Sequence, residues 1–142
     1  MTTGQIAVVV AIFVVIDAMV VPLLIRGMVG AAWSGLEQNF PGRPPAPDAV
    51  VREFQTVIVN AVNLGFSVHI GVDAGHLHLL PARFLRWFGA GPVSIPWDAV
   101  RDVVPVGAGR TMKAKVGNKT LAAPAWALRL ANASSKPDSQ GI

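Results

Sequence analysis

The chain has 142 residues, of which 52% are hydrophobic and only 14% charged, and its net charge is +4. A typical soluble domain has about 25% charged residues, and the length leaves room for one domain with an appended element. The positive charge would suit an anionic membrane surface. Nucleic acid is not an expected partner, because we find no DNA- or RNA-binding motif.

Residues 6–26 are the first predicted element, a transmembrane helix. Between Ile6 and Ile25 the only charged residue is Asp17, and a helix of this length would span roughly 30 Å, the thickness of the hydrocarbon core. A cleaved signal peptide would have a shorter apolar region preceded by basic residues, and a buried core helix would have a polar face. We therefore expect an uncleaved membrane anchor.

The basic residues indicate the orientation of this anchor. All 12 Lys and Arg residues follow the apolar segment, and the first of them, Arg26, lies directly at its end. By the positive-inside rule, residues 1–5 lie outside and the rest of the chain is cytoplasmic. Arg26 is then a candidate contact for anionic lipid headgroups.

Asp17 is the candidate partner contact within the anchor. It lies about 12 Å from the cytoplasmic end of the helix, which is too deep for its short side chain to reach the headgroups. Acidic residues inside membranes usually face protein, and the sequence offers no second transmembrane segment. We expect Asp17 to contact a helix of another chain; the alternative is a protonated side chain that faces lipid.

Residues 27–41 are predicted to form a short interfacial helix. Trp33, Leu36 and Phe40 have the spacing of one helix face, and a Pro-Gly pair ends the helix. This face could lie on the membrane surface and contact a partner, or it could pack on the domain that follows. Residues 42–52 then form a stiff linker, because the stretch PGRPPAP is rich in proline.

Residues 53–131 are predicted to form a small, mainly β domain. From Phe66 to Val72 apolar and polar residues alternate, and HLHLL alternates again after a turn, which predicts a hairpin with one buried face. VSIPWDAV and RDVVPV are expected to be further strands, and RTMKAKV and KTLAA a second hairpin around a Gly-Asn turn. PAWALRLANA is expected to be a short closing helix, and residues 132–142 a polar tail.

Three histidines, His69, His76 and His78, are expected on the face of the first hairpin that points away from the core. A cluster of imidazoles could bind zinc or copper. However, Asp73 is the only carboxylate nearby, and the chain has no cysteine. We therefore expect polar residues on a solvated strand face rather than a metal site, and we expect no cofactor.

The loop after the first hairpin alternates cations with bulky rings: Arg83, Phe84, Arg86, Trp87 and Phe88. This mixture is typical of a loop that faces a protein partner or the membrane interface. The alternative is that Phe84, Leu85 and Trp87 cover the sheet and the arginines are merely solvated. The number of apolar groups in the loop favours a partner-binding role.

The second hairpin carries a strip of cations, Arg110, Lys113 and Lys115. The two lysines are expected on one face of the hairpin. Anionic headgroups would attract such a strip by about 1 kcal/mol per cation. As the solvated face of a hairpin, the strip is also ordinary.

Three segments of the sequence occur together in a recognisable order: WSGL and FP (Trp33, Leu36, Phe40, Pro41), residues 72–79 and residues 93–103. Together they resemble a group of small bacterial single-pass membrane proteins that have a pleckstrin-homology-like β domain and no assigned activity. The resemblance implies two roughly orthogonal antiparallel sheets capped by a C-terminal helix. It also implies the bacterial inner membrane, with residues 1–5 in the periplasm.

The sequence shows no Ser–His–acid set at recognisable spacing, no phosphate-binding glycine loop and no paired carboxylates. We expect a non-catalytic accessory or scaffold subunit of a larger inner-membrane complex, whose β domain packs on other membrane-protein subunits. Respiratory and photosynthetic complexes are candidate hosts. The alternative is a membrane-anchored module that binds a lipid headgroup or another ligand.

Overall fold

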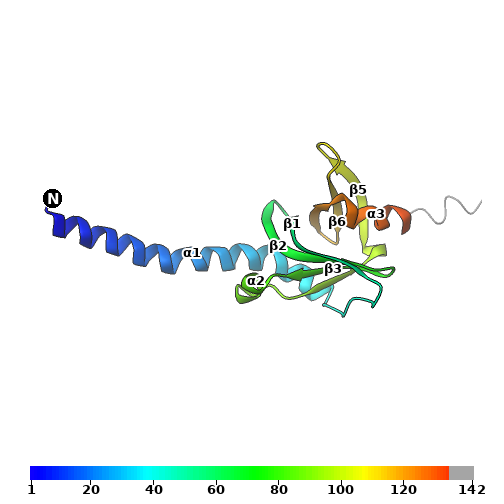
Figure 1. Cartoon of the computed structure of the whole chain (residues 1–142), viewed down its shortest axis with the longest axis horizontal. Helices are drawn as coiled ribbons and strands as arrows, with labels where there is room; N and C mark the ends of the chain where they lie inside the picture. Colours follow the sequence, from blue (N-terminus) through cyan, green and yellow to red (C-terminus); the bar gives the residue numbers. More distant parts are fainter. Residues whose placement is uncertain (135–142) are drawn as a thin grey trace, which may run out of the picture.

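The computed structural model describes residues 1–134 and combines one long helix with a β domain (Figure 1). The description excludes residues 135–142, most of the predicted polar tail, and the side chains at positions 130 and 132–134. In chain order the elements are α1 (Thr3–Asn39), β1 (Val50–Val59), β2 (Val62–Val72), β3 (His76–Pro81), α2 (Arg83–Trp87), β4 (Val93–Pro96), η1 (Trp97–Ala99), β5 (Val100–Val106), β6 (Thr111–Val116), β7 (Lys119–Pro124) and α3 (Ala125–Ser134).

Helix α1 is one uninterrupted element. Thr2 begins it with a capping box, in which its hydroxyl accepts from the Gln5 N–H and the Gln5 side chain accepts from the Thr2 N–H. Pro22 lies inside the helix and cannot donate to the carbonyl one turn earlier, yet the helix continues past it. Among the described residues, α1 is the helix that is long and apolar enough to span a membrane.

The continuity of α1 corrects the prediction of separate helices over residues 6–26 and 27–41. The stretch GMVGAAW after Arg26 contains two glycines, each costing about 1 kcal/mol of helix propensity, but no proline that would end the helix. The helix ends instead at Asn39, followed by Phe40 as its cap. Pro41 explains this end, because a proline disfavours the helical conformation in the residue before it.

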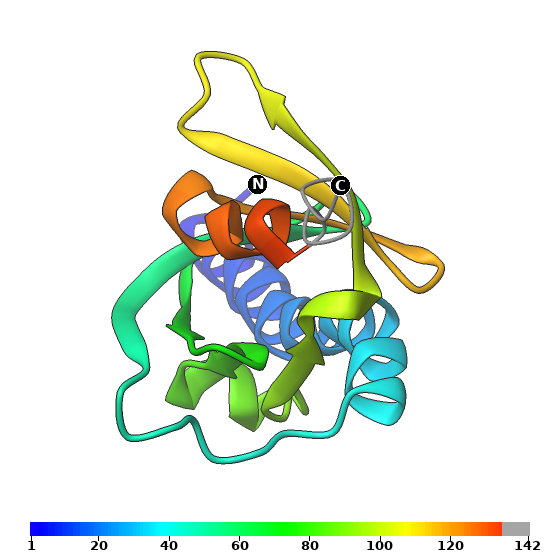
Figure 2. The same cartoon turned by 90° about the vertical axis from the view of Figure 1, so that its right-hand side faces the viewer.

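The seven strands form one antiparallel sheet in the order β4-β3-β2-β1-β7-β6-β5. This corrects the prediction of two orthogonal sheets. The end of β1 pairs with β7 while β1 also pairs with β2, so the hydrogen-bond ladder is continuous. β1 bends near Phe54, where its register with β2 shifts and φ is +52°. The sheet therefore curls, and the β5–β6 hairpin projects away from the other strands (Figure 2).

The predicted register of the first hairpin is confirmed. Ile70 pairs with Leu79, and both side chains lie in the core. The prediction was wrong at Phe66, which is 75% exposed, while its neighbour Ser67 is buried. The backbone of Phe66 has a φ of +52°. This irregularity interrupts the alternation at Phe66 and turns its ring outward, whereas Leu64 before it and Val68 after it are both buried.

The second hairpin and the closing helix are also confirmed. Gly117, with a φ of +59°, takes the first position of the two-residue turn between β6 and β7, as a type II′ turn requires. Lys113 and Lys115 are exposed, whereas Ala114 and Val116 are buried. Helix α3 begins directly after Pro124 and packs on β5, β7 and η1.

Candidate functional site

The docked part of α1 (residues 29–39) packs on the β domain. Val29, Ala32, Trp33 and Leu36 form a stripe along one helix face and are buried in the core. Trp33 is only 1% exposed. Trp33 and Leu36 are therefore not available to a membrane surface or a partner, and the alternative that this face packs on the following domain is correct.

Hydrogen bonds around Gly91 fix the docked part of α1 in place. The Trp33 indole N–H donates to the Gly91 carbonyl at 2.6 Å, and the Gly91 N–H donates to a Glu37 carboxylate oxygen at 3.2 Å. A Cβ added to Gly91 would lie 2.1 Å from the Glu37 carboxylate, so a larger residue there would displace this side chain. The Lys119 ammonium also donates to the Ala31 carbonyl at 3.2 Å.

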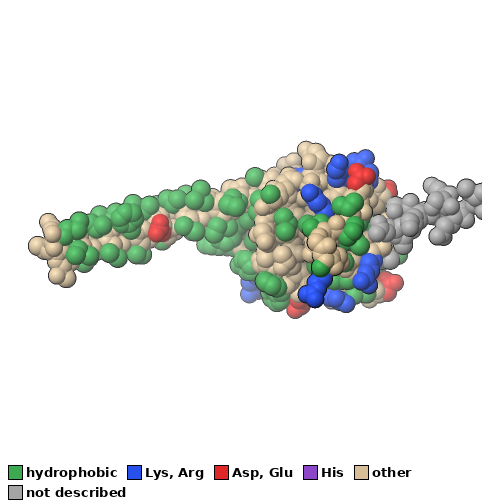
Figure 3. Space-filling model, turned by 90° about the horizontal axis from the view of Figure 1, so that it is seen from above, with side chains coloured by type: hydrophobic (Ala, Val, Ile, Leu, Met, Phe, Trp, Pro, Cys, Tyr) green, Lys and Arg blue, Asp and Glu red, His purple; other side chains and the backbone are tan. Residues whose placement is uncertain are grey.

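The projecting part of α1 (residues 3–28) extends away from the domain with almost all of its surface exposed. Apolar side chains cover most of the face of this rod that Figure 3 shows, with a single acidic side chain among them. This is Asp17, because no other acidic residue occurs before Glu37. Within this chain, the described residues give Asp17 no ion-pair partner.

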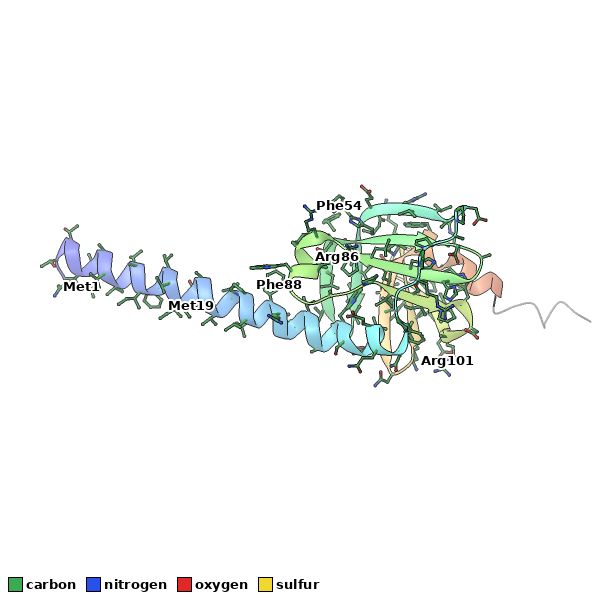
Figure 4. All side chains as sticks on the ribbon, turned by 90° about the horizontal axis from the view of Figure 1, so that it is seen from below. Met1, Met19, Phe54, Arg86, Phe88 and Arg101 are labelled. Atoms are coloured by element: carbon green, nitrogen blue, oxygen red, sulfur yellow. The ribbon has the colours of Figure 1, made fainter. Side chains whose placement is uncertain are left out.

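The predicted aromatic loop contains the short helix α2. Leu85 is buried, whereas Phe84 and Trp87, three residues apart, are exposed, and Trp87 is 76% exposed. Phe88 packs against Trp87, with ring centroids 5.0 Å apart. Only Leu85 takes the covering role proposed as the alternative. Figure 4 shows Arg86 and Phe88 at the end of the domain that faces the projecting helix.

A crevice of about 220 Å³ lies between α1 and α2, lined by Pro22, Leu23, Arg26, Trp87 and Phe88. We call it the α1–α2 crevice. Arg26 supplies its one formal charge, and the described residues contain no carboxylate that pairs with Arg26. On one side the crevice is lined by Pro22 and Leu23 from the end of the apolar segment, and on the other by the rings of Trp87 and Phe88.

A buried polar network, Asp73–His78–Ser94, is the feature that sequence reasoning missed. His78 is 1% exposed; its Nε2 donates to the Asp73 carboxylate at 2.6 Å, and its Nδ1 lies 2.8 Å from Ser94 Oγ. The network is buried because the linker (residues 40–49) covers it: the Ala46 N–H donates to Asp73, and the Arg43 N–H donates to Ser94 Oγ. The linker passes around the side of the domain that holds α2 and β4 (Figure 2).

The network contains the residue types of a hydrolytic triad, but its geometry favours a structural role. Ser94 is 4% exposed, and its hydroxyl oxygen is occupied by the Arg43 N–H at 2.7 Å. A nucleophilic serine needs an oxygen that substrate can reach. Here the hydroxyl instead ties the linker to β4.

Hydrogen bonds hold Asp73 in its ionised form. Burial disfavours the charge, but the bonds from His78 and from three backbone N–H groups outweigh burial, so the pKa of the Asp73 carboxyl lies well below its usual range. Two of those N–H groups, of Gly75 and His76, belong to the β2–β3 turn at 2.9 and 2.7 Å. This is an Asx-type turn, and the sequence Asp-Ala-Gly-His was its available signal.

The three histidines do not form the solvated row that the alternation predicted. His78 is buried under the linker, and His69 accepts a hydrogen bond from the Phe54 N–H at its Nδ1. The rings of His76 and His78 lie 5.7 Å apart. Within residues 1–134, no group of three or more His, Cys, Asp or Glu side chains is placed to hold a metal ion.

The remaining predicted contacts lie on the surface. Arg110, Lys113 and Lys115 are exposed, and the Lys115 ammonium lies 3.9 Å from an exposed Asp102 carboxylate. Phe40 is half-buried at the end of α1. Lipid contact by the cationic strip stays a prediction.

No known family model matches the chain, and no curated protein matches its sequence. The structure places segments 72–79 and 93–103 side by side, since β3 pairs with β4 and the Trp97 indole donates to the Asp73 carbonyl at 2.8 Å.

Proposed function

We propose that the protein is a non-catalytic, single-pass accessory subunit of a larger membrane-protein complex. Helix α1 crosses the membrane and holds the β domain against its cytoplasmic face. The observation that carries this proposal is Asp17, which is exposed on the projecting helix and is the only charged residue between Ile6 and Ile25. Acidic residues at this depth usually contact protein, and the partner in this proposal is a helix of another subunit.

The orientation and the membrane follow from charge and from the resemblance. All 12 Lys and Arg residues come after the apolar segment, which favours a periplasmic N-terminus and a cytoplasmic domain in a bacterial inner membrane. The absence of catalysis is supported by the Asp73–His78–Ser94 network, whose polar atoms are occupied in holding the linker.

We also propose that the domain is pleckstrin-homology-like. Strands β1–β4 form one meander and β5–β7 another, the two meet where β1 pairs with β7, and α3 packs beside the second meander. This order supports the resemblance stated from the sequence. Fold likeness by itself carries no ligand or activity.

The role of Asp17 is tested by purifying the full chain from its native membrane in mild detergent and identifying co-purifying proteins by mass spectrometry. Asp17→Leu should insert normally and lose partner subunits several-fold, because one interhelical hydrogen bond in a membrane contributes about 1 kcal/mol or more. A matched control, Asp17→Leu with Val15→Asp, keeps one acidic residue in the helix and moves it roughly 200° around the helix.

If Asp17 contacts a partner from one particular face of the helix, the control variant should not regain the co-purifying subunits. The proposal fails if Asp17→Leu retains all co-purifying subunits. It also fails if the relocated acid restores them fully, because the acid would then act without a preferred face.

A further inference from the structure

Because part of α1 is docked on the β domain, the depth of α2 relative to a membrane spanned by α1 is fixed. The first buried residue of the helix, Val29, follows Arg26 by three positions, or about 4.5 Å along the axis. Trp87 and Phe88 therefore reach the turn that contains Pro22 and Leu23. That turn belongs to the apolar segment, so with α1 in a membrane these rings lie at the membrane boundary rather than in the cytoplasm.

The side chains at this level have the chemistry of a membrane interface. Phe84 and Trp87 lie on one side of α2 and are exposed, and tryptophan is favoured at the depth of the headgroups. Arg26 lines the crevice with Trp87, and Arg83 and Arg86 lie on α2 itself. The described residues contain no carboxylate that forms an ion pair with these arginines.

We infer that the α1–α2 crevice binds the phosphate headgroup of an anionic phospholipid, with the exposed rings of α2 inserted into the bilayer beside it. This inference rests on the proposed membrane-spanning role of α1. Arg26 binds the phosphate, and the walls formed by Pro22, Leu23 and the Trp87 ring contact the glycerol and the upper acyl chain.

Two observations favour lipid over a protein segment as the occupant. The crevice is too small to hold a helix of another protein: its volume is about 220 Å³, and a helix with its side chains is about 10 Å across. The crevice is also lined by Pro22 and Leu23, which belong to the apolar segment of the projecting helix that acyl chains would cover.

Insertion of α2 is tested with the full chain reconstituted, without partners, in phosphatidylcholine vesicles whose acyl chains are brominated. Bromine should quench the fluorescence of Trp87 and leave the other tryptophans bright, because Trp33 and Trp97 are buried and Trp126 is covered by Arg52. Trp87→Phe should remove the quenchable part of the signal. An unquenched Trp87 would overturn the inference.

Headgroup binding is tested by counting the lipids that remain bound in native mass spectrometry after reconstitution in mixed phosphatidylglycerol and phosphatidylcholine. Arg26→Gln should lower the preference for phosphatidylglycerol by roughly fivefold, the factor that corresponds to about 1 kcal/mol per cation near a membrane. The matched control is Arg101→Gln, an exposed arginine that Figure 4 shows at the far part of the domain, which should change nothing.

Equal losses in the two variants would overturn the headgroup site, because the preference would then reflect net charge alone. Trp87 that is shielded from both bromine and aqueous acrylamide in native membranes would instead identify a protein on this surface, which also overturns the inference. These tests use the chain without partners or compare variants that retain Asp17. Their failure is therefore distinct from failure of the subunit proposal, and loss of carbonate-resistant membrane association would refute both.

Discussion

Asp73 joins segments that are far apart in the sequence. Its carboxylate accepts from the turn between β2 and β3, from His78 on β3 and from Ala46 in the linker. A buried acceptor with this many donors is stabilised as an anion, and it becomes costly when its charge or its partners are lost. Asp73 thus fixes the proline-rich linker on the domain together with Ser94, which bonds Arg43.

The lowered pKa of Asp73 predicts a loss of stability in acid. Because the folded chain holds the carboxyl ionised, the unfolded chain binds the proton more readily. The free energy of unfolding should therefore fall progressively as the pH drops below the ordinary carboxyl pKa of about 3.9. Urea unfolding of the full chain in detergent, followed across this pH range, measures the effect.

Asp73→Asn should remove most of this pH dependence and cost about 2 kcal/mol at neutral pH, because bonds to a charged acceptor are lost. Asp98→Asn, at an exposed carboxylate on η1, is the control and should stay within about 0.5 kcal/mol. An unchanged acid slope in Asp73→Asn would contradict the assignment.

For single residues, the sequence correctly predicted the features that depend on neighbours along the chain. The alternation around Ile70 gave the correct hairpin register because strand side chains have a period of two. The burial of His78 was missed, because it depends on the linker, more than twenty-five residues earlier in the chain. Phe66 was missed because its positive φ turns one side chain out of the alternation without any local signal in the sequence.

Helix α1 has two parts with different surfaces. Its projecting part exposes a long run of apolar side chains in which Asp17 is the one charged residue between Ile6 and Ile25, whereas its docked part is buried on one face only. The spacing of Trp33 and Leu36 predicted a helix face correctly. It could not decide between a membrane and the chain's own domain, because both accept the same apolar stripe.

Trp33 should be the main contact that joins α1 to the domain. Trp33→Ala removes a buried ring and its bond to Gly91, and it should lower the free energy of unfolding by about 3–5 kcal/mol. Trp87→Ala is the matched control, because Trp87 is exposed, and it should change the free energy by less than about 0.5 kcal/mol. Similar unfolding curves for both variants would mean that the docked helix contributes nothing to the fold.

The α1–α2 crevice could not be predicted from the sequence, because its two sides come from distant parts of the chain. Arg26 and the aromatic loop were each identified as candidates, but more than fifty residues separate them. Only the packing of α1 on the sheet places Arg26 beside Trp87.

In the whole molecule, α1 is one continuous helix, so the direction in which Asp17 points around the helix axis is fixed relative to the β domain. Inserting one alanine between Gly27 and Met28 would turn the domain by roughly 100° relative to Asp17 and move it by about 1.5 Å. If both the domain and Asp17 contact the same complex, this insertion should reduce the co-purifying subunits several-fold while the fold stays intact.

Inserting seven residues at the same place provides the comparison. It restores the rotation to within roughly 20° but moves the domain about 10 Å along the axis. This variant should lose the quenching of Trp87 by brominated lipid. Full co-purification after the single insertion would show that the domain and Asp17 act independently.

The uninterrupted helix also makes the domain responsive to bilayer thickness. The helix continues without a break from the apolar segment into its docked part, and the bonds at Gly91 fix the docked part on the domain, so a tilt of the helix is also a tilt of the domain. An apolar segment that exceeds the local hydrocarbon thickness tilts in the bilayer. In a thinner bilayer one side of the domain would therefore swing toward the headgroups and the opposite side away from them, and the orientation presented to a partner would change with the lipid surroundings.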